Sequence, residues 1–413
     1  MKKPLFFACL LMAAMTATAQ EKTLSFDAQL RTRGEYRNGA VTPREEGDRA
    51  ATFVNERARL RATFRRGDLS VRLSAQHTGV WGQDPQVDKQ GRVAIHEAWA
   101  RMTFADDAFF VQLGRQPLVY DDERLLGALD WNVAGRTHDA LRAGYQDGPN
   151  QVHLILALNQ NDEPTKQVWY DAAKGQPYKS MEAVWYHYDG HHQLIPFDVS
   201  VLFMNLGLEQ GTALTNHSDV KHMQTLGTHI NATPIDGLDA TASLYYQMGN
   251  ETSAWMASLK AAYRLDDAWR VHAAYDYLSG DDGKGTKNHA FSPLYGTHHN
   301  FYGAMDYFYA SAWKRGNVGL QDIQLGVKSD YIGWLPMQLT YHYFATAAKV
   351  PGQDAILGLG HEVDYQLSYR LSPNVSLSGG YSFMLGKHTM DIVKGGDHSR
   401  WQDWGWLQVN VSI

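Results

Sequence analysis

The sequence contains a single cysteine, Cys9, and it lies in the apolar segment near the amino terminus. A lysine pair precedes this apolar run, which covers 5–15, and the Ala-Thr-Ala of 17–19 forms a cleavage motif. This order is typical of a secretory signal, so we expect 1–19 to be a cleaved signal peptide. The mature chain, 20–413, then has no cysteine, which excludes disulfides and cysteine-ligated metal sites.

Long apolar runs are also missing after residue 20. None approaches the ~18 consecutive apolar residues of a membrane-spanning helix. No proline-, glycine- or serine-rich linker and no low-complexity tract divides the chain, which favours one domain over 20–413. Aromatic residues, in contrast, make up 12% of the sequence and include 22 tyrosines and 12 tryptophans. If this chain lies in a membrane, only a closed β-barrel can satisfy its backbone hydrogen bonds there.

Apolar and polar residues alternate along much of the sequence. The alternation is clear in 24–37, 238–248, 363–371 and 407–413, where every second residue is apolar or aromatic. Successive side chains of a strand point to opposite faces. These segments are therefore predicted to be strands with one apolar and one polar face.

The same pattern predicts about 18 strands, near 24–37, 53–66, 69–82, 93–104, 109–116, 137–146, 150–159, 180–189, 197–207, 221–233, 238–249, 252–265, 268–278, 321–331, 336–346, 360–372, 375–386 and 402–413. Short connections such as 67–68, 234–237 and 373–374 alternate with mostly long ones such as 117–136 and 279–320. Short periplasmic turns and long outer loops are typical of outer-membrane barrels. The predicted fold class is all-β, a transmembrane antiparallel β-barrel in the cell outer membrane, and a large soluble all-β protein is the alternative.

In such a barrel the polar face of each strand lines the lumen. The polar positions of the early strands carry many arginines: Arg31, Arg33, Arg57, Arg59, Arg61, Arg72, Arg101 and Arg142. Residues of one face are ~7 Å apart along a strand and neighbouring strands are ~5 Å apart, so these side chains are expected to form one wall. Because a guanidinium stays charged and can bind a carboxylate through two hydrogen bonds, such a wall favours anions.

A structural role for these arginines stands beside the selective one. The sequence, of net charge −6, also supplies inward-facing acids that can neutralise them: Asp27, Glu35, Glu97, Asp139, Asp276, Glu362 and Asp364. Partly hydrated ion pairs of this kind are individually weak. A selectivity wall and an ion-pair network therefore remain two interpretations that can coexist.

Three motifs, in this order, resemble the alginate-export family of outer-membrane barrels. The first is LGRQPLVYDDERLLGALDWNVAGRTHDALRAGY at 113–145, in which a Gly-Arg-Gln strand end leads to a loop and then to a Gly-Arg-Thr-x-Asp strand start. The second is YDYLSGDDGKGTKNHAFSPLYGTHHNFYGAMDYF at 275–308, with Ser-Gly-Asp, Phe-x-Pro-Leu-Tyr and Gly-x-Met-Asp elements. The third is Gly-His-Glu-x-Asp at 360–364. The resemblance extends over about 24–413.

The resemblance implies an 18-stranded barrel whose lumen is narrowed by inward-folded loops and lined with arginines. It implies passive passage of an anionic uronic-acid polysaccharide. Loops 117–136 and 279–320 would constrict or gate the pore, with Phe291 and Tyr295 anchoring the second. By their place in the motif, the residues that would line or brace the constriction are Arg115, Asp122, Arg124, Arg136 and Asp139. Because this chain is shorter than the exporters, a general anion or oligosaccharide porin is the alternative.

The remaining patterns favour other classes of protein less. Histidines at 187, 191 and 192, the pair at 298–299, and GDDGKG at 280–285 offer metal ligands, but without the spacing of a zinc or calcium site. No nucleophile elbow, zinc-protease motif or nucleotide-binding loop is present, although a barrel can anchor an enzyme or an adhesin. An acidic exported chain is a poor partner for nucleic acid. We expect no catalysis, metal or cofactor, and as partners an anionic polysaccharide or sugar, outer-membrane lipid and periplasmic export or uptake components.

Overall fold

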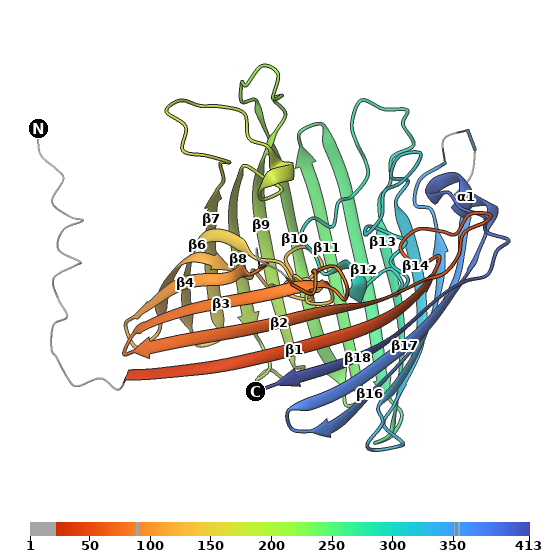
Figure 1. Cartoon of the computed structure of the whole chain (residues 1–413), viewed down its shortest axis with the longest axis horizontal. Coiled ribbons are helices and arrows are strands. Elements are labelled where there is room, and N and C mark those ends of the chain that lie inside the picture. The colour runs from red at the N-terminus through yellow and green to blue at the C-terminus, as the bar shows by residue number, and fades with distance from the viewer. Residues whose placement is uncertain (1–21, 88–90, 351, 354–355) are drawn as a thin grey trace, which may run out of the picture.

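The strands of the chain form one closed β-barrel. The computed structural model describes residues 22–87, 91–350, 352–353 and 356–413, so the predicted signal peptide lies outside the described residues. Eighteen antiparallel strands follow one another around the barrel, and β1 pairs with β18 to close it (Figure 1). The predicted fold class is confirmed.

The strands agree with the sequence pattern within a few residues at each end. The first nine are β1 Lys22–Asn38, β2 Ala51–Arg66, β3 Leu69–Val80, β4 Ala94–Phe104, β5 Phe109–Gln116, β6 His138–Asp147, β7 Asn150–Leu158, β8 Ser180–Asp189 and β9 Phe197–Glu209. The other nine are β10 Val220–Ile235, β11 Leu238–Gly249, β12 Thr252–Arg264, β13 Trp269–Leu278, β14 Leu320–Ser329, β15 Met337–Ala345, β16 Gly358–Ser372, β17 Val375–Gly386 and β18 Gln402–Ser412. The helices of the described residues are short: η2 Ala172–Lys174, η3 His298–Asn300 and α1 His388–Lys394. In the described part of the chain no helix has the length and hydropathy needed to cross a membrane.

Short and long connections gather at opposite rims of the barrel. The short turns, such as those at 67–68, 236–237 and 373–374, lie at the rim that also holds the carboxyl terminus (Figure 1). The long connections leave the other rim, and two of them, 117–137 and 279–319, fold inward. We call these two segments the first inner loop and the second inner loop.

The outer surface carries the apolar phase of the strands. On β1, Leu24, Phe26 and Leu30 are 59%, 63% and 44% exposed, whereas Arg31 and Arg33 of the opposite phase are buried. Exposed apolar side chains and buried charged ones are expected where the outer surface faces lipid and the lumen is polar.

The packed core lies inside the barrel, between the strands and the second inner loop. Phe291, Met305 and Phe308 of that loop are fully buried and belong to one hydrophobic cluster with Leu278 and Phe344 of the wall. The loop therefore fills part of the lumen instead of covering the rim.

Candidate functional site

The first inner loop crosses the lumen. Near its start, Asp121 accepts hydrogen bonds from Trp185 on β8 and Ser200 on β9, at 2.9 and 2.5 Å. Arg124 reaches β13, where its Nη2 lies 2.9 Å from Oδ1 of Asp276. Asp130 then contacts β1 and β2 on another part of the wall. Ten residues thus connect separate sectors of the barrel.

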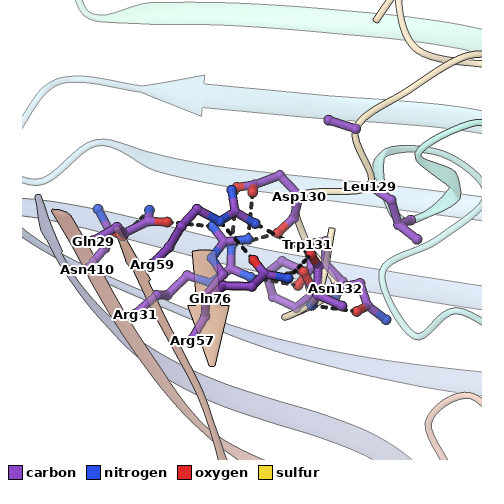
Figure 2. Close-up of polar contacts among 12 residues, drawn as sticks. Gln29, Arg31, Arg57, Arg59, Gln76, Leu129, Asp130, Trp131, Asn132 and Asn410 are labelled. Atoms are coloured by element: carbon purple, nitrogen blue, oxygen red, sulfur yellow. Dashed lines mark hydrogen bonds and ion pairs between the residues drawn. The ribbon is translucent and has the colours of Figure 1, made fainter. Parts of the chain in front are cut away.

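The loop meets the arginine wall at Asp130. Arg31 and Arg57 are directly opposite in the β1–β2 register, so their charges would repel each other. Oδ1 of Asp130 lies 2.8 Å from Nη1 of Arg57, and Oδ2 lies 3.2 Å from Nη1 of Arg31. Arg31 also donates to the backbone carbonyls of Asp130 and Asn132 (Figure 2). One loop carboxylate therefore bridges two wall arginines.

The loop also covers the neighbouring arginines. The guanidinium of Arg33 lies 3.7 Å from the ring centre of Trp131 and donates to Glu35. Arg59 donates to Gln76 at 2.9 Å and to the carbonyl of Ala134 at 3.4 Å (Figure 2 labels Arg59 and Gln76). We call the arginines of this wall the arginine ladder. Its outer half, Arg31, Arg33, Arg57 and Arg59, is buried and anchors the loop.

Toward the turn-bearing rim the arginine ladder continues with Arg61 and Arg72, which are partly exposed. Arg61 pairs with Asp27 at 2.8 Å and lies 3.8 Å from Glu97. Arg72 lies 3.8 Å from the other oxygen of Glu97, and its guanidinium is above the ring of Trp99. The Arg61 and Arg72 side chains are 30% and 29% exposed, whereas that of Arg57 is 1% exposed.

Two further arginines share one aromatic ring. The guanidinium of Arg101 on β4 lies 3.8 Å from the ring centre of Phe110, and that of Arg142 on β6 lies 5.4 Å from it. Arg142 also donates to Gln112. Both arginines extend the basic surface to β6 on the inward side.

Arg115 and Asp139 point away from the lumen. They are paired in the β5–β6 register and form a two-bond ion pair at 2.9 and 2.7 Å. Arg115 has the strand phase of Leu113, which is 61% exposed to the outside, and Gln116 of the opposite phase is fully buried. The pair therefore lies outside the wall near the loop rim, and does not line the constriction as the family motif implied.

The other predicted residues of the first inner loop join the two inner loops. Arg124 is buried and contacts Asp122, Asp276 and the hydroxyl of Tyr302 in the second inner loop. Arg136 donates to the backbone carbonyls of Tyr295 and Gly296. Neither residue is free to bind a solute, so their position is structural.

The joint between the loops continues along their backbones. Leu126 and Tyr295 form a short parallel bridge. Glu123 accepts from the Thr297 hydroxyl at 2.6 Å, and Thr297 accepts from the amide of Leu129 at 3.0 Å. The two inner loops therefore form one connected plug.

Carboxylates of the wall hold the far part of the second inner loop. Glu362 accepts from the amide of Met305 at 2.8 Å, and Asp364 accepts from the amide of Ala304 at 3.2 Å. His342 lies between Asp322 and Asp364, at 3.0 and 3.3 Å. The Gly-His-Glu-x-Asp motif thus serves to dock the loop.

A polar cavity of about 340 Å³ opens beside this plug. Trp131, His299 and Trp406 form its aromatic side, and Trp131 stacks on His299 at 3.9 Å. Strands β12 to β16 contribute amide and basic groups, among them Lys260, His272, Gln324, Gln338 and Gln366, and one carboxylate, that of Asp364. Its volume lies in the range of small-molecule sites.

Charge partners fix the ionisation of the loop groups. Withdrawal from bulk water acts to raise the pKa of Asp130, but the hydrogen bond and charge of Arg57, followed by the charge of Arg31, outweigh it and lower the pKa. Burial likewise acts to lower the pKa of Arg124, and the negative charges around it, Asp276 first, raise it instead. Both anchors are therefore charged at neutral pH.

Two residues of the alternative metal motifs shape the local structure around them. His191 pairs with Asp189 at 2.6 Å in an exposed turn. In the GDDGKG segment, Asp281 accepts from the amides of Gly283 and His289, so its carboxylate shapes the start of the second inner loop. Asp130 lies in the motif at 113–145, but its role was not predicted, because its partners Arg57 and Arg31 are about 70 and 100 residues away in the sequence.

A closed barrel with an apolar outer surface, a polar lumen and inward-folded loops defines an outer-membrane channel of the porin type. Solved structures of this class are similar to the chain in fold. They include Acinetobacter baumannii OccAB4 (TM-score 0.64, 11% identity, 96% of this chain and 99% of that chain). Pseudomonas aeruginosa OccK9 (OpdG) is similar at TM-score 0.61 and 15% identity, over 94% of this chain and 98% of that one. OccK2 (OpdF) of the same organism, solved with glucuronate, has TM-score 0.58 and 14% identity with the same coverage.

The chain belongs to the alginate export family, whose model matches residues 22–361. The resemblance read from the three sequence motifs is therefore confirmed. No curated protein matches the chain in sequence.

Proposed function

We propose that this outer-membrane channel passes anionic saccharides passively through its arginine-lined lumen, with an alginate-like uronic-acid polymer as the substrate. The observation that carries the proposal is the unequal charge where the first inner loop meets the wall. Two carboxylates, Glu35 and Asp130, form ion pairs with four arginines there, namely Arg31, Arg33, Arg37 and Arg57, and Arg59 beside them donates to Gln76. Asp306 and Glu97 lie farther off and offset part of this positive charge. A positive excess in a narrow lumen raises the local concentration of anions.

The two halves of the ladder would have different tasks. The covered half, with Arg57 and Arg31, holds the loop and contributes its field over a distance. The accessible half, with Arg61 and Arg72, would contact the solute, because a guanidinium can bind a carboxylate with two parallel hydrogen bonds. A saccharide carboxylate there competes with Asp27 and Glu97, which keeps binding weak enough for release.

A general porin for small sugar acids is the second candidate. The cavity of about 340 Å³ beside the plug favours it, since this volume suits a small molecule better than a polymer. Its tryptophans and amides are suited to a sugar ring and its hydroxyls. Two neighbours in fold were solved with small carboxylates, OccK2 with glucuronate and OpdK with vanillate.

Planar-bilayer recordings of Arg61→Gln, Arg72→Gln and the double variant test the proposal. The reversal potential is expected to shift toward cations, most strongly at low salt. The reason is that the Debye length, ~10 Å at 0.1 M, grows as the salt concentration falls, so the fixed charges are screened less. Block by uronate oligomers is expected to weaken as well. Arg400→Gln is the control, since Arg400 pairs with Asp397 and Glu46 on an outer loop.

An unchanged anion preference at both low and high salt would refute the arginine-lined pathway. The length of the blocking oligomer separates the two candidates. Monomeric glucuronate blocking as well as long oligomers would favour the small-solute porin, whereas block that strengthens with length would favour the polymer channel.

A further inference from the structure

Two histidines and an aspartate converge on the outer connection between β17 and β18. His388 and Asp391 lie three residues apart on α1, and His398 follows after the turn that ends this helix. Nδ1 of His398 and Nδ1 of His388 lie 2.5 and 3.7 Å from the same oxygen of Asp391, Oδ2. One ligand atom from each residue falls within 4.8 Å of the others.

We propose that His388, Asp391 and His398 form a binding site for a divalent transition-metal ion such as Zn²⁺. Two imidazoles and one carboxylate are a ligand set that such ions prefer, and Mg²⁺ or Ca²⁺ would call for more oxygen ligands. A metal ~2.1 Å from each ligand atom requires these atoms to be ~3.3 Å apart. The three atoms already lie within 4.8 Å of one another, so this spacing is reached when the 2.5 Å His398–Asp391 contact opens and the His388 ring, 3.7 Å from Asp391, moves closer.

The backbone preorganises the group. Oδ1 of Asp391 accepts the amide of His398 at 2.7 Å, which orients Oδ2 toward the two rings. The chain returns to this position through Gly395 and Gly396, whose φ values of 81° and 87° favour glycine. The amide of His398 thus fixes the orientation of the carboxylate, as hydrogen bonds from outside the coordination sphere do for metal ligands.

No lysine or arginine of the described chain forms an ion pair with Asp391. Its two ion-pair partners are the histidines themselves. The nearby Lys394 is buried and donates to the carbonyls of Ser311 and Ala312, and Arg400 pairs with Asp397 and Glu46. The carboxylate charge thus remains available to a cation.

The site is also open to solvent. The side chains of His388, Asp391 and His398 are 78%, 21% and 36% exposed. Water can complete the coordination, as in zinc sites with three protein ligands. Because α1 contacts the second inner loop through the Lys394 bonds, a bound ion would also stiffen this connection.

Calorimetric titration of the tag-free barrel in detergent with ZnCl₂ tests the site. We expect one ion per chain, and at least tenfold weaker binding in His388→Ala, in His398→Ala and in Asp391→Asn. His191→Ala is the matched control, because His191 also contacts an exposed aspartate, at 2.6 Å, but belongs to no group of three converging ligand atoms among the described residues. MgCl₂ is expected not to compete.

Co²⁺ absorption provides a second readout that does not depend on heats of binding. Ligand-field bands in the visible are expected for the parent and the His191→Ala variant, and their loss for His388→Ala and His398→Ala. Each variant is also run on a gel with and without heating. The same shift in mobility between the unheated and the heated sample in every variant shows that the barrel is folded. Zinc binding that survives both histidine changes, or its absence in the parent protein, would overturn the proposal.

Discussion

Arg31 and Arg57 are directly opposed on β1 and β2, and the carboxylate of Asp130 binds both. Two like charges at one register position are unfavourable unless an acid neutralises them. Here the acid comes from the first inner loop instead of a neighbouring strand. The position of this loop is therefore coupled to the charge of the wall.

Asp130→Asn tests this coupling. Removing the carboxylate leaves Arg31 and Arg57 unpaired, so we expect the loop to loosen at a cost of about 1 kcal/mol, a value discounted because the Asp130 side chain is 64% exposed. Single-channel recordings should show more frequent current fluctuations and a stronger anion preference. Asp162→Asn, on an exposed outer loop, is the control and should change neither. Quiet traces with unaltered selectivity would contradict the coupling.

Arg124→Met addresses the joint between the inner loops and the wall. Arg124 and Asp276 are both buried, and breaking a buried pair by removing one partner costs about 3–5 kcal/mol. We expect a clearly lower midpoint in thermal unfolding, together with faster proteolysis of the second inner loop. Arg270→Met removes an exposed pair with Asp239 and should cost less than about 1 kcal/mol. Equal losses in the two variants would show that the buried joint is not stabilising.

Leu325 and Gln324 are adjacent on β14 but face opposite sides of the barrel wall. Leu325 is 55% exposed on the outer surface, and Gln324 donates to Asp276 and Asp322 inside. Arginine at position 325 is expected to cost about 2–4 kcal/mol, since it faces the middle of the bilayer. Arginine at 324 faces two acids and should cost much less. Unfolding in urea with lipid vesicles measures both, and similar costs would mean that the assignment of the two faces is wrong.

Lys394 predicts a pH dependence of the contact between α1 and the second inner loop. Burial lowers the pKa of Lys394 from its ordinary value to about 7. Between pH 7 and the ordinary lysine pKa of ~10.4 the opened state binds more protons than the docked one, so docking is stabilised as the pH rises, by at most about 1.4 kcal/mol per unit. Below pH 7 both states are protonated and the slope vanishes.

The measurement is limited proteolysis between pH 6 and 9, with rates normalised to a peptide of the same sequence. Cleavage of residues 387–401 should slow as the pH rises above 7. Lys394→Met should abolish this slope, because it retains the apolar packing and has no titrating group. A slope that persists in the variant would assign the effect to another group.

The sequence by itself determined the strands and their faces, because the period of two is a local property. Segment 238–249 was predicted with the bounds that β11 has, and Arg31, Arg33, Arg57 and Arg59 are buried on the inner side as their phase requires. The phase also contained the signal that Arg115 faces outward. Phe109, Val111 and Leu113 are apolar and outward, and Arg115 continues their alternation.

The tertiary structure alone decided what the inward residues contact. Arg57 and Asp130 are 73 positions apart, and Arg124 and Asp276 are 152 apart, and no periodicity relates them. Such pairs form because an inner loop has to bury its polar groups against whichever wall residues it reaches, and buried charges require partners. The docking of the loop divides the arginine ladder into a covered and an exposed half. Alternation could therefore place the arginines on the inner wall, but it could not tell which of them the loop covers.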